Sequence, residues 1–275
     1  MNRVTVRTPI VRYRDGVFTS RPDTVAGEEP LEIRVGGEPF TTTMRTPGAD
    51  VELAHGLLHA EGVITGRDDV RSARYCPGVG PDGLNTYNVL DVSLADPAAT
   101  HLVRPRALVT TSACGVCGAE TIDAVTQVSR YVPGQIIMTP ETISALPERL
   151  RARQRTFRST GGIHACGLAT ADGLIEDVRE DVGRHNAMDK VIGAALLADR
   201  LPLADRALVT SSRASFELVQ KAVLAGVGLL VAVSAPSSLA VQLAGRTGLT
   251  LIGFTSASGF NIYTGGWRVT GATAS

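Results

Sequence analysis

The chain has 275 residues, of which 44% are hydrophobic and 20% are charged, which is a globular composition and excludes a mainly disordered protein. The 27 Lys and Arg residues balance the 27 Asp and Glu residues, so bulk charge gives no reason to expect binding to nucleic acid. The longest apolar run, residues 222–235, contains two glycines and is shorter than the roughly 20 residues of a membrane span. The first residues alternate apolar and charged side chains, unlike a secretory signal, so we expect a cytoplasmic protein without a membrane span.

The first part of the chain predicts a small α+β domain. Residues 31–43 fit two strands around the turn pair Gly36-Gly37, and residues 47–61 have helical apolar spacing with Asp50 as candidate N-cap. Residues 87–94 alternate like a strand, and a proline-containing stretch follows. We therefore place a domain boundary at residue 106, with one domain over residues 1–106 and a second over residues 107–275.

The second domain predicts an alternation of strands and helices. It opens with a strand at residues 107–113, and a helix over residues 139–153 has Thr139 as its cap and Pro140 in its first turn. A hairpin about Asp172-Gly173 and a helix over residues 183–199 follow. Strands at 206–212, 229–234 and 249–255 then alternate with helices at 215–226 and 237–248. This order predicts an α/β fold with a mostly parallel sheet covered by helices on its faces.

The strongest chemical motif is the segment SACGVCG, in which Cys114 and Cys117 stand before a segment of helical spacing. A helix N-terminus lowers the pKa of a thiol, and the flanking glycines leave room for a partner, so the motif favours thiol chemistry. Alternatively, both cysteines fill space as small hydrophobic residues. A zinc site needs four ligands, and only His164 and Cys166 in GGIHACG offer the other two.

A second metal-based alternative rests on His59-Ala60-Glu61, which matches the first half of the zinc deaminase signature. Ala113 stands before Cys114 where that signature requires proline, and His59 lies in the other predicted domain. We therefore expect no tightly bound metal.

Four polar segments are further candidates. The segment 176–193 predicts either an anion site at a helix start or a solvated, salt-bridged helix face. Ser211-Ser212-Arg213 and the residues after the last strand follow strand ends, where open α/β sheets bind ligands. The arginine-rich run 148–158 fits an exposed helix face or a docking site for an acidic partner.

In this order, the motifs SACGVCG, GGIHACG, EDVGRHNAMDKVIG, SSRASFELVQKA and GFTSASGFNIYTG resemble the FdhD/NarQ family of formate dehydrogenase accessory sulfurtransferases. The resemblance implies a cytoplasmic homodimer whose second domain is a three-layer, cytidine-deaminase-like α/β domain. It also implies that persulfide sulfur passes from a cysteine desulfurase to the molybdenum cofactor, Mo-bis(molybdopterin guanine dinucleotide). The cofactor then enters formate dehydrogenase.

Residue by residue, the resemblance makes Cys114 the persulfide carrier and Cys117 the second cysteine of the family's CxxC. The cofactor-binding segment corresponds to Phe254, Thr255, Ser256, Ala257, Ser258 and Gly259. Many members carry arginine where this chain has Ser256, so we expect Arg213 or His185 to supply that charged contact. Two other functions stay open, a zinc-dependent deaminase-like hydrolase and a non-catalytic cofactor chaperone, and no role is assigned to Cys76 or Cys166.

Overall fold

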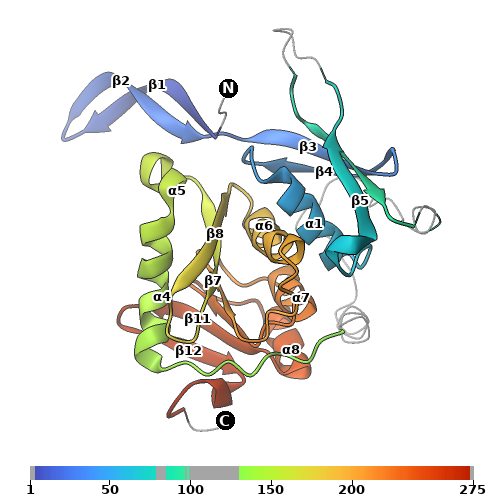
Figure 1. The fold of residues 1–275 in the computed structure, drawn as a ribbon. Helices are drawn as coiled ribbons and strands as arrows, with labels where there is room; N and C mark the ends of the chain where they lie inside the picture. Colours follow the sequence, from blue (N-terminus) through green and yellow to red (C-terminus); the bar gives the residue numbers. More distant parts are fainter. Residues whose placement is uncertain (1–3, 79–84, 97, 99–129, 273–275) are drawn as a thin grey trace.

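Three β-sheets organise the chain in a computed structural model that describes residues 4–78, 85–96, 98 and 130–272 (Figure 1). They are a two-stranded ribbon, a four-stranded sheet and a six-stranded sheet, so the fold is mixed α/β, as predicted. None of the helices among the described residues is long and apolar enough to cross a membrane.

The N-terminal part contains the ribbon and the four-stranded sheet. The four strands run in the order β4-β3-β6-β5, and the β3–β4 hairpin turns at Gly36-Gly37 as predicted. The ribbon was not predicted, although Asp15-Gly16 between two alternating runs is a strong turn signal. The elements are β1 (Thr5–Arg14), β2 (Val17–Ala26), β3 (Glu29–Val35), β4 (Glu38–Arg45), α1 (Asp50–Ala60), η1 (Arg67–Asp69), β5 (Val70–Tyr75) and β6 (Val89–Leu94).

The predicted start of α1 is wrong by one residue. Ala49 is the N-cap, with φ 55°, and Asp50 is the first helical residue. The Asp50 carboxylate does not cap the helix because Arg45 and Tyr75 both donate to its Oδ2, each at 2.9 Å. Asp50 therefore joins the helix start to two strands.

The second part is built on the six-stranded sheet, with strand order β12-β11-β10-β9-β7-β8. The predicted hairpin, helices and alternating strands all form, and Thr139 caps α4 by accepting from the backbone N–H of Thr142. The elements are α4 (Pro140–Arg153), α5 (Arg155–Thr160), β7 (His164–Ala169), β8 (Ile175–Asp181), α6 (Arg184–Leu197), β9 (Ala207–Thr210), α7 (Phe216–Leu224), β10 (Leu229–Ala232), α8 (Ser238–Thr247), β11 (Thr250–Ser256), β12 (Gly259–Thr264) and η2 (Gly266–Arg268).

The sheet is mixed, which corrects the prediction of a mostly parallel sheet. Only β9, β10 and β11 run parallel, whereas β12, β7 and β8 pair antiparallel. Short turns join β7 to β8 and β11 to β12, and such turns reverse the chain, whereas parallel neighbours need a crossover. Periodicity predicts a strand but not its direction.

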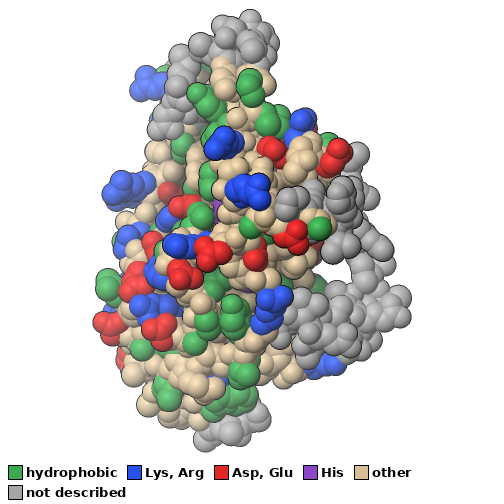
Figure 2. Space-filling model, turned by 45° about the vertical axis from the view of Figure 1, so that its right-hand side comes forward, with side chains coloured by type: hydrophobic (Ala, Val, Ile, Leu, Met, Phe, Trp, Pro, Cys, Tyr) green, Lys and Arg blue, Asp and Glu red, His purple; other side chains and the backbone are tan. Residues whose placement is uncertain are grey.

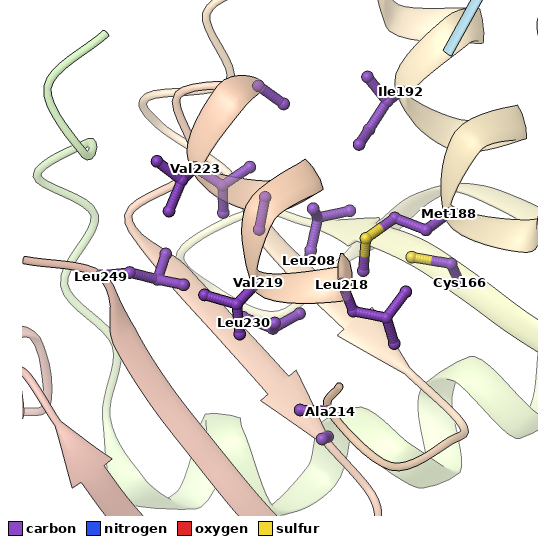
Figure 3. Packing of buried hydrophobic residues seen from close by; sticks show 14 of the residues in the cluster. Cys166, Met188, Ile192, Leu208, Ala214, Leu218, Val219, Val223, Leu230 and Leu249 are labelled. Atoms are coloured by element: carbon purple, nitrogen blue, oxygen red, sulfur yellow. The ribbon is translucent and has the colours of Figure 1, made fainter. Parts of the chain in front are cut away.

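Helices cover both faces of this sheet and give three layers. One core lies beneath α6, α7 and α8; Figure 3 shows Met188 and Leu218 of the helices over Cys166 and Leu230 of the strands. The other core lies under α4 and includes Ile143. The more specific expectation of a cytidine-deaminase-like domain stays a prediction.

The two parts of the chain pack through α1 and α6. A Cβ added to Gly56 of α1 would stand 1.9 Å from the carbonyl oxygen of Asp189, and one added to Gly193 of α6 would stand 1.8 Å from that of Glu52. The two helices therefore touch backbone to backbone, and Leu196 of α6 belongs to the core of the four-stranded sheet. The predicted boundary at residue 106 lies outside the described residues and stays a prediction.

Candidate functional site

The carboxyl ends of the three parallel strands meet at one edge of the six-stranded sheet. The loops that follow them are joined by backbone hydrogen bonds, from Ser234 to Ser212 at 3.4 Å and from Phe254 to Ser234 at 3.3 Å. Because β7 runs antiparallel to β9, its first residue, His164, lies at the same edge. The two strand-end segments singled out in the sequence are thus brought together.

A pocket of about 610 Å³ opens beside this edge. Thr255, Ser256 and Ala257 line one side, and α4, α5 and the start of β7 line the other, including Gln154 and His164. Three of the six residues of the predicted cofactor segment therefore border a cavity. Phe254, Ser258 and Gly259 belong to the same turn but are not part of the pocket wall.

Two polar groups in the pocket wall lack hydrogen-bond partners among the described residues. They are Nε2 of Gln154 and Oγ1 of Thr255, and each residue is only 2% exposed. Buried donors and acceptors are rarely left unpaired, so these atoms favour a polar ligand at the wall. No sequence signal identified Gln154, because its place opposite Thr255 arises only when the helices pack on the sheet.

The turn that carries the segment is held in a strained conformation. Phe254 has φ 53° although it is not glycine, and its side chain is half exposed. Ser256 and Ser258 meet through their hydroxyl groups at 2.9 Å. Such strain often occurs at ligand-binding turns, which supports this segment as a binding element.

A cluster of titratable side chains lies at the starts of α6 and α7. His185 Nε2 lies 3.1 Å from Ser215 Oγ and 3.7 Å from the Glu217 carboxylate. The neighbouring His185 side chain lowers the pKa of Glu217 to about 2. Burial lowers the pKa of His164, and the nearby charges of Arg184 and His185 lower it further, so a neutral imidazole faces the pocket.

Arg213 or His185 was expected to supply the charged contact that an arginine makes in many members of the FdhD/NarQ family. Neither residue is part of the pocket wall. His185 is engaged by Ser215 and Glu217, whereas the exposed Arg213 makes no ion pair among the described residues. Arg213 follows β9 at the same edge. Of the two candidates, Arg213 is the one whose charge is uncompensated.

Half of the residues of the polar segment 176–193 are buried, among them Asp181, Asp189 and Lys190, which corrects both interpretations of the segment. Lys190 Nζ lies 2.7 Å from Asp181 Oδ2 and donates to the carbonyl oxygen of Thr46 at 2.8 Å. Lys221 Nζ likewise lies 2.7 Å from Asp189 Oδ1. These pairs hold α6 against its neighbours and are neither a solvated face nor an open anion site.

The four cysteines differ in what the structure shows of them. Cys114 and Cys117, on which the sulfur chemistry depends, lie outside the described residues. Cys166 is fully buried, and burial raises the pKa of its thiol, so it packs as a neutral apolar side chain. Cys76 is half-buried.

His59 is a packing residue in the described structure. It is buried, and its Nε2 donates to the carbonyl oxygen of Leu224 at 3.1 Å, at the contact of α1 with α7. Within the described part of the chain, no three or more His, Cys, Asp or Glu side chains are grouped to hold a metal ion.

Comparison with known proteins gives a consistent result across nearly the full length. The FdhD/NarQ family model matches residues 26–270. A protein of Streptomyces coelicolor named "Sulfur carrier protein FdhD" is 52% identical over 98% of this chain and 97% of its own length. A protein of the same name from Mycobacterium tuberculosis is 52% identical over 93% of this chain and 95% of its own.

A solved structure supports the fold. A candidate formate dehydrogenase accessory protein from Desulfotalea psychrophila superposes with a TM-score of 0.74, covering 97% of this chain and 99% of the other. Sequence identity is 23%, so this likeness concerns the fold alone.

Proposed function

The chain belongs to the FdhD/NarQ family, and from this premise we propose that it carries sulfur as a persulfide on Cys114. The sulfur would come from a cysteine desulfurase and go to the molybdenum cofactor, which would then enter formate dehydrogenase. The observation that carries the proposal is the name "Sulfur carrier protein FdhD", given to relatives that are 52% identical over nearly the entire chain.

The chemistry requires one nucleophilic sulfur. The Cys114 thiolate attacks the outer sulfur of the donor persulfide; a new S–S bond forms, the donor's S–S bond breaks, and the donor cysteine leaves as a thiolate. No oxidant is consumed, because the transferred sulfur keeps its oxidation state. Only the Cys114 sulfur reacts in this step, so loading does not require Cys117.

The cargo site that we propose is the pocket at the strand ends. Its polar wall groups, Gln154 and Thr255, suit the edge of a guanine base, and its apolar walls, such as Leu150 and Val233, suit the base's faces. Arg213, exposed at the same edge, suits a pyrophosphate oxygen. The cofactor itself is cargo, and supplies the molybdenum that receives the sulfur.

Three broader features belong to the same proposal. We infer a cytoplasmic protein, a homodimer, and a second domain of cytidine-deaminase type that does not use zinc. The helix–sheet–helix layers of the six-stranded sheet support the last of these.

The deciding experiment is a mass measurement on the intact protein after incubation with a cysteine desulfurase and cysteine. We expect wild type and Cys117→Ser to gain the mass of one sulfur atom and Cys114→Ala to gain none. If wild type gains no sulfur, the protein is no carrier and only chaperoning of the cofactor is left. Elemental analysis tests the hydrolase alternative, since a zinc ion lost with Cys117→Ser would favour it.

The cargo site has a separate test. Calorimetric titration with GDP, as a stand-in for one nucleotide end of the cofactor, should give binding that Thr255→Val weakens. Thr250→Val is the matched control: it removes a buried threonine hydroxyl at the opposite end of β11, where that hydroxyl bonds to Gly265. Equal affinities for all three proteins would contradict this placement.

A further inference from the structure

The β1–β2 ribbon, defined here as the arm (residues 5–26), projects from the body (Figure 1). It exposes large apolar side chains. Tyr13 and Phe18 at its tip are 63% and 72% exposed and contact each other with ring centroids 4.8 Å apart. Val11, two residues before Tyr13 in β1, is 68% exposed. An isolated two-stranded ribbon is only marginally stable in water, so this apolar surface favours a partner that covers it.

A second feature lies where the arm joins the body. A pocket of about 570 Å³, defined here as the basal pocket, is lined by Val4 just before β1, by the loop before α1, and by α4, α5 and β8. Four arginines line it. Arg179 is paired with Glu52 at 2.5 Å, and the other three are Arg153, Arg155 and Arg158. All three are exposed and belong to the arginine-rich run of the sequence, which the proposed sulfur chemistry does not use.

The charge of these arginines is not neutralised within the described structure. Arg153 donates to backbone carbonyl oxygens of Ile175 and Glu176, and Arg155 and Arg158 form no ion pair among the described residues. The carboxylate in the pocket, Glu180, accepts from two backbone N–H groups of α5, each at 2.8 Å. The basal pocket thus has excess positive charge.

The arm itself adds to this charge. Arg7 and Arg12 make no ion pair among the described residues, and Arg14 and Arg21 reach Asp15 and Asp23 only at 3.9 Å. Elsewhere, over much of the face in Figure 2, basic and acidic side chains lie beside one another. In a protein of zero net charge, the arm and the basal pocket are therefore a local concentration of free cations.

We propose that the arm and the basal pocket together bind an acidic segment of a partner protein that also carries apolar side chains. Acidic side chains would occupy the basal pocket, and apolar ones would cover Val11, Tyr13 and Phe18 at the arm. Each strand of the arm has 10 residues, so the surface suits an extended segment of comparable length, roughly 30 Å.

Two observations select this occupant. Pairing of this surface with the same surface of a second copy would bring the arginines of one basal pocket against those of the other, which opposes association. Addition of a strand to the arm is also hindered, because Pro9 and Pro22 face each other near its centre and each outer edge lacks a donor at that position. A partner is therefore favoured to bind through side-chain contacts with an oppositely charged segment.

This surface is separate from the pocket at the strand ends. The basal pocket shares no lining residue with the pocket at the strand ends. Charge reversal on α5 should therefore leave persulfide loading by a small-molecule donor unchanged while it abolishes docking.

The test is fluorescence anisotropy of the full chain with a labelled peptide of alternating glutamate and leucine. We expect binding that weakens with added salt, about tenfold or greater loss for Arg155→Glu/Arg158→Glu, and a similar loss for Tyr13→Ser/Phe18→Ser. Arg246→Glu is the matched control, since Arg246 is an exposed arginine on α8 and should leave affinity unchanged. All these side chains are exposed, and circular dichroism checks that the variants keep the fold.

Several results would overturn the proposal. A lysine–leucine peptide that binds equally well would show that charge does not select the partner. Binding of inorganic pyrophosphate in place of the peptide would make the basal pocket a small-anion site. A change from dimer to monomer in Tyr13→Ser/Phe18→Ser would show that a second copy of the chain covers the arm.

Discussion

Lys190 and Asp181 form an ion pair that is buried almost completely, at 2% and 0% exposure of their side chains. Asp181 also accepts from the backbone N–H groups of Thr46 and Gly183. The pair therefore joins the loop before α1 to β8 and α6. A buried carboxylate keeps its charge at low cost only while this partner is present.

We predict that Lys190→Met lowers the free energy of unfolding by about 3–5 kcal/mol, because it leaves the Asp181 charge buried without its cation. Urea denaturation followed by circular dichroism measures this. The double variant Lys190→Met/Asp181→Asn should lose less than the single variant, since it removes the stranded charge. If the double variant is the less stable of the two, the argument fails.

Single residues were predictable from the sequence where their chemistry is local. Thr139 caps α4 because its hydroxyl needs only the backbone three residues ahead. Asp50 does not cap α1, because Arg45 and Tyr75 take its carboxylate, and nothing near Asp50 in the sequence specifies that. Likewise, Thr255 could be named through the family resemblance, whereas Gln154 could not.

At the scale of the elements, helices α1 and α6 are in close contact, with Gly56 and Gly193 at the crossing. We predict that Gly193→Ala lowers the free energy of unfolding by about 3 kcal/mol, since its Cβ would stand 1.8 Å from a backbone oxygen. Gly245→Ala is the matched control in helix α8, where the added Cβ meets Thr264 at an ordinary 3.6 Å. That change should be neutral or stabilise by up to about 1 kcal/mol in the same urea titration.

The contact of α1 with α7 gives a prediction about pH. Burial lowers the pKa of His59 below its ordinary 6.5, so the folded state binds this proton less readily than the unfolded state. The stability contribution of neutral His59 is therefore fully present above pH 6.5 and is lost as the pH falls below it.

His59→Gln removes the proton site, and its amide can still donate to Leu224. We expect its free energy of unfolding to fall less steeply than that of wild type below pH 6.5. Some slope should persist, because burial also lowers the pKa values of His55 and His164. Identical slopes for the two proteins would contradict the prediction.

Elements with strong periodicity were predicted well, whereas the pairing of strands in the sheets was not. Helices α4, α6, α7 and α8 and the strands between them follow from apolar spacing and turn residues. The short strands β5 and β12 and the antiparallel pairing of β7 with β9 were missed, because pairing partners and direction are set by distant parts of the chain. The strand and helix predicted around Cys114 lie outside the described residues.

At the scale of the whole molecule, shared elements predict cooperative unfolding. Leu196 of α6 packs in the core of the four-stranded sheet, and Arg179 of β8 pairs with Glu52 of α1 at 2.5 Å. We therefore expect one unfolding transition, in which fluorescence of Trp267, the single tryptophan, coincides with far-UV circular dichroism. Two separated midpoints would show that the parts unfold independently.

The junction of α4 and α5 has a consequence for the way the two pockets communicate. Arg153 and Arg155 face the basal pocket, and Gln154 between them faces the pocket at the strand ends. A ligand that displaces these three residues from one side would therefore also displace part of the wall on the other. Thermodynamic linkage makes this effect reciprocal. If the bound acidic segment changes the affinity for the nucleotide by some factor, the bound nucleotide changes the affinity for the segment by the same factor.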